Sequence, residues 1–273
     1  MSAATIPTSL CRKAHTPAEF LQHLQQTQNF LIAPECIHFD MDFPPAEEVI
    51  DILRRDDATS IRSPQETSKD QDQALSEWVR TAPIEEVIEN GAFGLSNFEL
   101  NHFYGPDQFL HELQDRVMIP WRTFLSQHGY TWQRCAPYIF ISTKGISSTY
   151  HADYSHVMAW QLDGTKTFNG FIDPEKYGPI DHIIKKGNAP RSTEIAPHDE
   201  DDLLTYTMEP EDLLWNHLLT PHWVTAGAEK AAFSLNISHG GLRHRGQFLA
   251  NEAPLRARWQ DHPEEAWATD LRY

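Results

Sequence analysis

The chain has 273 residues, of which 40% are hydrophobic and 11% aromatic, enough apolar surface for one large domain with a substantial core. Its formal net charge is −17 at pH 7, and the short basic groupings at 185–186 and 243–245 are typical of solvated loops. The composition therefore argues against nucleic acid as a partner and against a disordered chain.

The cysteines and the hydropathy pattern indicate a cytoplasmic protein. Cys11, Cys36 and Cys135 show neither paired nor C-x-x-C spacing, so we expect no disulfide framework and no structural zinc site. The N-terminal residues 1–15 lack the apolar run of a signal peptide, and no window is apolar enough to span a membrane.

Residues 1–136 carry mostly helical signals. Thr16 and Glu19 form a capping-box pattern with Pro17 at the first helical position, which predicts a short amphipathic helix. The apolar run at 29–33 suits a strand. Further helical patterns lie at 45–54, 74–79, 106–117 and 121–128, with a break expected at Pro120.

The polar segment 56–73 has few apolar anchors, so it is expected to be a long surface loop, either a lid or a mobile segment. After Pro137 the sequence changes to short runs rich in β-branched and aromatic residues between turn residues, the pattern of a sandwich or barrel. The predicted strands are 138–142, 147–151, 157–162, 167–172, 203–208, 212–215, 222–226 and 232–237.

About eight strands is the number in a jelly roll, so the predicted fold is mainly β with helical additions. We expect a double-stranded β-helix (jelly-roll or cupin) core at 137–241. The helical region 1–136 would pack on this core, and the tail 242–273 would end in a short helix near 263–271.

The triplet His151-Ala152-Asp153 lies where a predicted strand ends, and alternate strand residues share a face, so both polar side chains can point the same way. His222 can supply a third ligand from a distant strand. Two imidazoles and a carboxylate hold iron(II) and leave positions open for a co-substrate and dioxygen, whereas zinc is normally four-coordinate. Each residue taken singly is more often structural; together they indicate a metal site.

The order of motifs around this triplet resembles the JmjC and cupin-like family of 2-oxoglutarate oxygenases. That family has a hydroxyl residue, H-x-D, a strand, a G-x-K turn, and later P-x-D before the distal histidine. Here the matching segments are 148–153, Gly-Thr-Lys at 164–166, Pro-Glu-Asp at 210–212, and His222. The resemblance implies an enzyme that uses Fe(II), 2-oxoglutarate and O2.

By this resemblance Lys166 is expected to pair with the distal carboxylate of 2-oxoglutarate. The chemistry of lysine gives independent support, because burying its charge in a core-facing strand is costly unless an anion lies beside it. Ser148 or Thr149 could add a hydroxyl to the same carboxylate. Asn236 is a weaker candidate for the pocket wall.

Two positions depart from the family pattern and leave the distal ligand open. Glu211 stands where a turn glycine is usual, and His217 stands where proline is common, so His217 competes with His222. The spacing from Asp212 and the strand that follows favour His222. His156 is disfavoured as a ligand because its odd offset from His151 places it on the opposite face of an extended chain.

The predicted reaction is hydroxylation of an amino-acid side chain, free or in a peptide, or of a related small metabolite. Demethylation begins with the same step, so the metal site does not separate the two outcomes. The alternatives are a metal-dependent cupin enzyme that does not use 2-oxoglutarate, and a metal-free cupin-like binding module. The expected partner is a small-molecule or peptide substrate, and a homodimer is left open.

Overall fold

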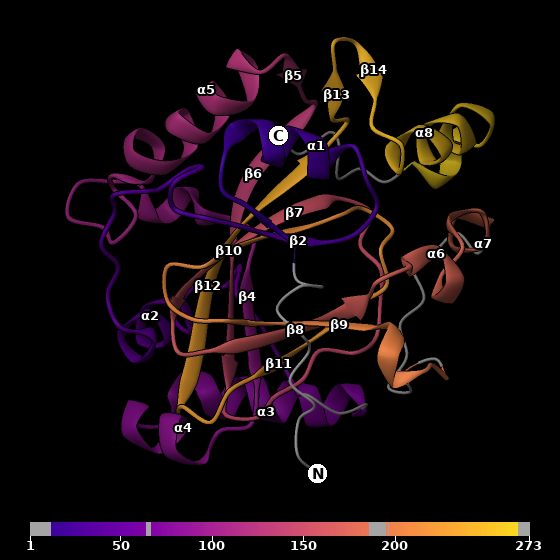
Figure 1. Cartoon of the computed structure of the whole chain (residues 1–273). Helices are drawn as coiled ribbons and strands as arrows, with labels where there is room; N and C mark the ends of the chain where they lie inside the picture. The colour runs from indigo at the N-terminus through magenta and orange to yellow at the C-terminus, as the bar shows by residue number, and fades with distance from the viewer. Residues whose placement is uncertain (1–11, 64–66, 186–194, 196, 267–273) are drawn as a thin grey trace.

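The protein, seen here as a computed structural model, is built around two facing β-sheets; its described residues are 12–63, 67–185, 195 and 197–266. The large sheet has eight strands in the order β1-β2-β10-β7-β12-β6-β4-β3, and the small sheet has the order β11-β8-β9 (Figure 1). The large-sheet strands are β1 (Lys13–Ala14), β2 (Phe30–Ile32), β3 (Ser60–Arg62), β4 (Gly94–Asn97), β6 (Arg134–Thr143), β7 (His156–Asp163), β10 (Leu213–Asn216) and β12 (Ala231–Gly240). The small-sheet strands are β8 (Lys166–Phe171), β9 (Leu203–Met208) and β11 (Trp223–Ala226).

The two faces of the large sheet are buried against different partners. Alternate residues such as Ile139, Trp160 and Leu235 face the N-terminal helices and belong to the main hydrophobic core. The opposite face packs on the small sheet, as expected for a sandwich. The residues of this second core are Ala159, Phe168, Leu204, Tyr206, Met208 and Leu214.

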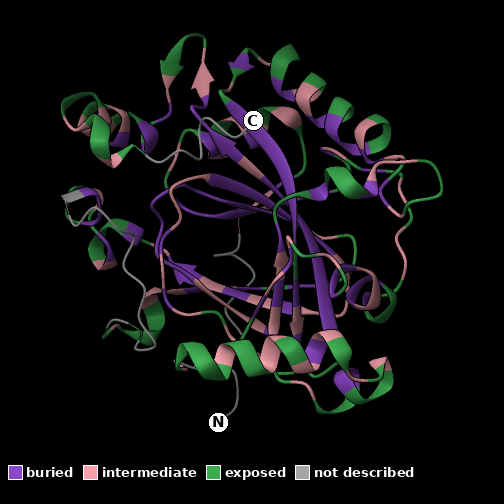
Figure 2. Cartoon of the chain, turned by 180° about the vertical axis from the view of Figure 1, so that it is seen from behind, coloured by how far each residue is buried: buried purple, intermediate pink, exposed green. Residues whose placement is uncertain are grey.

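Helices cover the outer face of the large sheet, whose strands are buried in the centre of the molecule (Figure 2). The α-helices are α1 (Pro17–Leu24), α2 (Ala46–Leu53), α3 (Lys69–Thr81), α4 (Ile84–Asn90), α5 (Ile119–Gln127), α6 (Pro174–Tyr177), α7 (Ile180–Lys185) and α8 (Glu252–Asp261). Short β5 (Tyr130–Thr131), β13 (Arg243–His244) and β14 (Gln247–Phe248) form a third sheet beside them. None of the described helices is long and apolar enough to cross a membrane.

The predicted capping box of α1 is confirmed. The Thr16 hydroxyl accepts from the Glu19 N–H at 3.2 Å, and the Glu19 carboxylate accepts from the Thr16 N–H at 3.2 Å. The apolar face of the helix then buries Phe20, which meets Trp121 and Trp215 edge-to-face. This helix therefore covers the centre of the large sheet.

Several predictions in the first half were wrong. Residues 56–73 were predicted to be a loop but contain the edge strand β3. This strand has a single buried residue, Ile61, and is too short to show alternation. Residues 64–66 lie outside the described part. Of the predicted helix 106–117, residues 106–112 form turns, and only the end is helical, where the π-helical turn Gln114–Met118 leads directly into α5. Pro120 lies in the first turn of α5, directly after this π-helical turn, so the break expected there is a change of hydrogen-bond pattern within a continuous helical segment.

Seven of the eight predicted core strands are present. The exception is 147–151, which forms only two isolated bridges, Ser147 with Thr225 and His151 with His222; between them the Ser148 hydroxyl, not a backbone carbonyl, accepts from the Val224 N–H. The boundary proposed after residue 136 falls inside β6. The C-terminal helix is α8, ahead of Pro263, which begins only a 3₁₀ turn; the remainder of the predicted 263–271 helix lies outside the described residues.

Gly164 forms the turn between β7 and β8 with φ of 61°, and a Cβ there would lie 2.4 Å from the Ala231 carbonyl oxygen. Gly145 has a similar φ of 68° but open space around it. We expect Gly145→Ala to lower the free energy of unfolding by about 1–2 kcal/mol, the left-handed cost alone. Gly164→Ala should lower the free energy of unfolding further, because the backbone at Ala231 must also move to make room for the Cβ. Urea unfolding of both variants measures this, and equal losses would contradict the close contact.

Candidate metal centre

Backbone pairing brings the predicted metal ligands together. His151 donates its N–H to the His222 carbonyl at 2.9 Å, and His222 donates to the His151 carbonyl at 2.8 Å. His222 directly precedes β11, and Asp153 follows in the loop that leads to β7. The bridge therefore places two histidines from distant parts of the sequence side by side, with ring centroids 4.3 Å apart.

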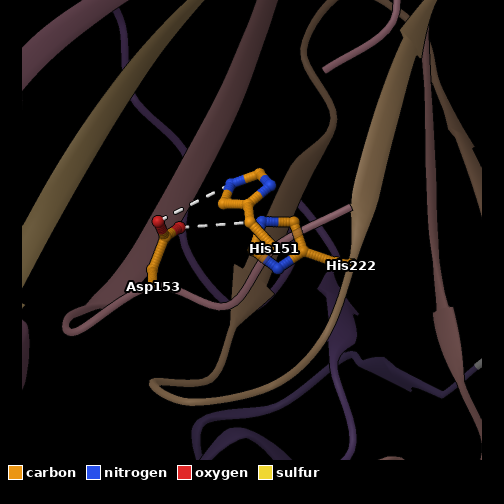
Figure 3. A group of neighbouring side chains, drawn as sticks. All are labelled: His151, Asp153 and His222. Carbon is orange, nitrogen blue, oxygen red and sulfur yellow. Dashed lines mark ion pairs between the residues drawn. The ribbon is translucent and has the colours of Figure 1, made fainter. Parts of the chain in front are cut away.

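Both histidines are oriented by their own chain. His151 Nδ1 lies 2.6 Å from the Thr149 carbonyl oxygen, and His222 Nδ1 lies 2.9 Å from the Thr220 carbonyl oxygen. A carbonyl only accepts, so Nδ1 is the donor in each ring, and in the neutral ring Nε2 carries the lone pair that can bind a metal. Both Nε2 atoms face the Asp153 carboxylate, at 3.7 Å from His151 and 3.6 Å from His222 (Figure 3).

This donor set fits a metal ion. The ligand atoms of His151, Asp153 and His222 all lie within 4.8 Å of one another. Bonds of about 2.1 Å place neighbouring donors about 3 Å apart, so small side-chain movements would close the site. Burial and the neighbouring His151 lower the pKa of His222 to about 4, so its ring is neutral near pH 7 and can coordinate. A second cluster among the described residues, His262, Glu264 and Glu265, is more exposed, and Glu265 is already paired with Arg258.

Lys166 lies inside the sandwich. It is 5% exposed, and its ammonium donates to the Phe140 carbonyl at 3.0 Å and to the Ser234 hydroxyl at 2.7 Å. Both acceptors are neutral, and burial lowers the pKa of Lys166 to about 7. Phe168, on the same face of β8, stacks on the His222 ring at 5.0 Å. The lysine and the histidine site therefore share one interior.

The other pocket residues predicted from the sequence, Ser148, Thr149 and Asn236, differ in burial and in contacts. Ser148 is exposed, and its hydroxyl accepts from the Val224 N–H at 2.9 Å, whereas the Lys166 ammonium contacts Phe140 and Ser234. Thr149 is half-buried, and its contact with His151 is made by its backbone carbonyl. Asn236 is 4% exposed and has the inward parity of β12.

Ser234 was missed by the sequence prediction, although it has the same parity as Asn236 and contacts Lys166 directly. An alternating pattern of small polar residues in β12, at Ser234, Asn236 and Ser238, was the signal that could have found it. Small polar residues at alternate positions of an otherwise apolar strand mark a face that lines a polar interior.

Of the two candidate distal histidines, the structure brings His222 to His151 and Asp153. His217 is 1% exposed and lies instead against His156 and Phe30, with ring centroids 5.6 and 5.9 Å away. His156, the first residue of β7, is also not part of the triad, and its ring stacks on Trp215. Burial lowers the pKa of His217 to about 3 and also holds the pKa of His156 well below its usual value.

No protein-family model and no curated protein matches the sequence. Solved structures of the Escherichia coli ribosomal oxygenase YcfD do match, one at 16% identity and a TM-score of 0.51 over 81% of this chain and 50% of that chain. Its complex with cobalt and 2-oxoglutarate matches at 17% identity and a TM-score of 0.51, with the same shares covered. This chain thus spans about half the length of those structures, and across 81% of its own length it has their fold.

Proposed function

We propose that the protein is an Fe(II)- and 2-oxoglutarate-dependent oxygenase whose two sheets form a jelly roll around the site. One observation carries the proposal: the Nε2 atoms of His151 and His222 and the Asp153 carboxylate converge, with both Nδ1 atoms held by carbonyls. Two nitrogens and one oxygen on one side of an ion form the facial triad of non-haem iron(II) oxygenases. The YcfD complex with cobalt and 2-oxoglutarate has the same fold and supports this assignment.

The buried ammonium of Lys166 supports 2-oxoglutarate as the co-substrate. A cation that meets only a carbonyl and a hydroxyl has lost its hydration without gaining a counter-charge. A carboxylate beside Lys166 would supply that charge and form a charge-assisted hydrogen bond. In this proposal one end of the dicarboxylate lies at Lys166 and the other at the metal, on the side of β8 where Phe168 stacks on His222.

The residues of the chain bind and orient in this proposal. Iron(II) would supply the redox chemistry that dioxygen requires, with 2-oxoglutarate as the electron source. The carbonyls of Thr149 and Thr220 keep both histidines in the ligating tautomer. Phe168 covers one side of the His222 ring and keeps water from that side of the site.

We propose an amino-acid side chain as the substrate, either free or within a peptide, and hydroxylation as the reaction. Halogenation is disfavoured, because Asp153 would fill the coordination position that a halide needs at the metal. The chemistry of the triad itself is shared by hydroxylation and by demethylation, which begins with a hydroxylation. The substrate therefore decides the outcome.

The test is turnover of the co-substrate. Purified protein with Fe(II), ascorbate and 2-oxoglutarate is expected to form succinate, and candidate amino acids or peptides should raise the rate when one is a substrate. Protein without added iron is the control. Iron binding without any succinate would favour a cupin enzyme that does not use 2-oxoglutarate, and absence of both would favour a binding module.

A further inference from the structure

The segment 217–222, here named the ligand loop, carries His222 from β10 to β11 and is completely buried. Its residues from His217 to Thr220, and His222, are each at most 2% exposed, although connecting segments normally lie at the surface. A buried loop must find partners for its backbone groups inside the protein. Leu219 also has φ of 60°, a left-handed conformation that is costly for a leucine. Its shape is therefore imposed by its surroundings.

Two side chains from separate parts of the chain hold the start of the ligand loop. The Asn29 side-chain oxygen accepts from the His217 N–H at 2.9 Å, and its amide donates to the Asn216 side chain at 2.7 Å. His156 Nδ1 accepts from the Leu218 N–H at 3.2 Å. That contact requires a neutral ring with the proton on Nε2, in agreement with the lowered pKa of this buried histidine.

The third side chain comes from the start of α8. Asn251 is 3% exposed and donates its amide to the Leu218 carbonyl at 2.9 Å. Its neighbour Glu252 anchors the helix, because this buried carboxylate accepts from the Leu242 N–H at 2.7 Å and from Arg256 at 2.6 Å. The C-terminal helix is thereby attached to the ligand loop as well as to the end of β12.

The loop in turn contacts two metal-site residues through its backbone. The Leu219 N–H donates to the Asp153 carbonyl at 2.7 Å, and the Thr220 carbonyl accepts from His222 Nδ1 at 2.9 Å. Both contacts depend on the left-handed turn at Leu219. A change of loop conformation would therefore displace the carboxylate ligand and the distal histidine together.

We propose that Asn29, His156 and Asn251 are positioning residues that hold the ligand loop in the one conformation that completes the metal site. This inference rests on the proposed function, since it assumes that the triad binds a metal. The three residues come from segments that are far apart in the sequence: Asn29 precedes β2, His156 begins β7 and Asn251 precedes α8. None of the three touches the metal position directly; each acts through the backbone of the loop.

Cobalt(II) binding, followed by visible absorption, tests the proposal without requiring turnover. His156→Leu removes the acceptor for Leu218, whereas His156→Asn places a side-chain oxygen near the position of Nδ1. We expect His156→Leu and Asn251→Ala to weaken cobalt binding by at least ~10-fold and to alter the absorption band, as loss of outer-shell partners does. His156→Asn should restore most of the affinity. Rescue by the conservative variant separates positioning from general loss of packing.

Asn97→Ala is the matched control. Asn97 is completely buried and bonded to the Thr59 hydroxyl at 2.9 Å, away from the ligand loop. This variant should lose thermal stability and keep the wild-type cobalt affinity. If His156→Leu and Asn251→Ala bind cobalt as tightly as Asn97→Ala, the positioning role is overturned and the metal site stands. If folded wild-type protein binds no cobalt, the proposed function itself fails.

Hydrogen exchange on the wild-type protein tests the same point if a variant does not fold. The amides of Leu218 and Leu219 should exchange slowly in metal-free protein, because His156 and the Asp153 carbonyl already hold them. Fast exchange that becomes slow only when cobalt is added would show that the metal, not these side chains, orders the loop. That result would overturn the inference.

Discussion

Asp153→Ala and His222→Ala are each expected to weaken metal binding by more than ~100-fold and to remove succinate formation, because each leaves an open-faced site with two protein ligands. The fold should survive the first change, since the Asp153 side chain is 33% exposed and lies in a loop. Cobalt(II) titration followed by visible absorption measures affinity, and circular dichroism measures folding. Folded variants that bind cobalt as the wild type does would contradict the triad.

Two histidines serve as controls for this experiment. His128 Nδ1 also faces a carbonyl, that of Phe124 at 2.7 Å, so His128→Ala removes a histidine of similar local geometry outside the site. His217→Ala separates the two candidate distal ligands. We expect both variants to bind cobalt, with His217→Ala losing thermal stability because that ring is buried. Loss of cobalt in His217→Ala together with binding in His222→Ala would reverse the assignment.

Lys166→Met is expected to weaken 2-oxoglutarate binding by about 10- to 150-fold, the equivalent of about 1.5–3 kcal/mol for a hydrogen bond to a charged group. Metal affinity should be retained, because Lys166 contacts Phe140 and Ser234 and not the ligands. Anaerobic titration of the Fe(II) protein with 2-oxoglutarate, followed by its charge-transfer absorption band, measures the affinity. Lys230→Met, which removes a 60% exposed lysine side chain, is the control.

The same titration should depend on pH in the wild type and not in Lys166→Met. Burial lowers the pKa of Lys166 from 10.5 to about 7, so the ammonium that binds the carboxylate is lost as the pH rises above about 7. Affinity should then fall by up to ~10-fold per pH unit. The stability effect has the opposite sign. The unfolded lysine keeps its proton up to about 10.5, so between these values a rising pH favours the folded state. Equal affinities at pH 6.5 and 8.5 would argue against an ammonium anchor.

Local rules were sufficient for much of the fold. The capping box at Thr16 identified α1, and runs of β-branched and aromatic residues identified β6, β7, β8 and β12, because their periodicity reports which face is buried. The same rules failed for β3, because a three-residue edge strand is too short to show a periodic pattern. Its strand conformation is fixed by backbone pairing with β4. At Pro120 the expected break is a change from the π-helical turn to α5 without an interruption of the helix.

One departure from the family pattern has a structural cost that sequence alone did not reveal. Glu211 occupies the turn position where glycine is usual, and its φ is 79°, in the left-handed region. The turn is retained because the Glu209 N–H donates to the Asp212 carboxylate at 2.9 Å. A glutamate can therefore stand in this turn at the cost of strain.

The sequence by itself determined the residue types of the site. It predicted a metal site from an H-x-D triplet and a later histidine, and singled out a lysine in a core-facing strand, since ligand chemistry and strand parity are local properties. Only the tertiary structure placed His222 instead of His217 beside His151 and Asp153, set a carbonyl against Nδ1 of both histidines and placed Ser234 beside Lys166. Those choices depend on backbone pairing and on hydrogen bonds between segments far apart in the chain, such as Asn29, His156 and Asn251 around one buried loop. Contacts of that kind leave no periodicity in the sequence, because each partner is selected by the geometry of the folded chain.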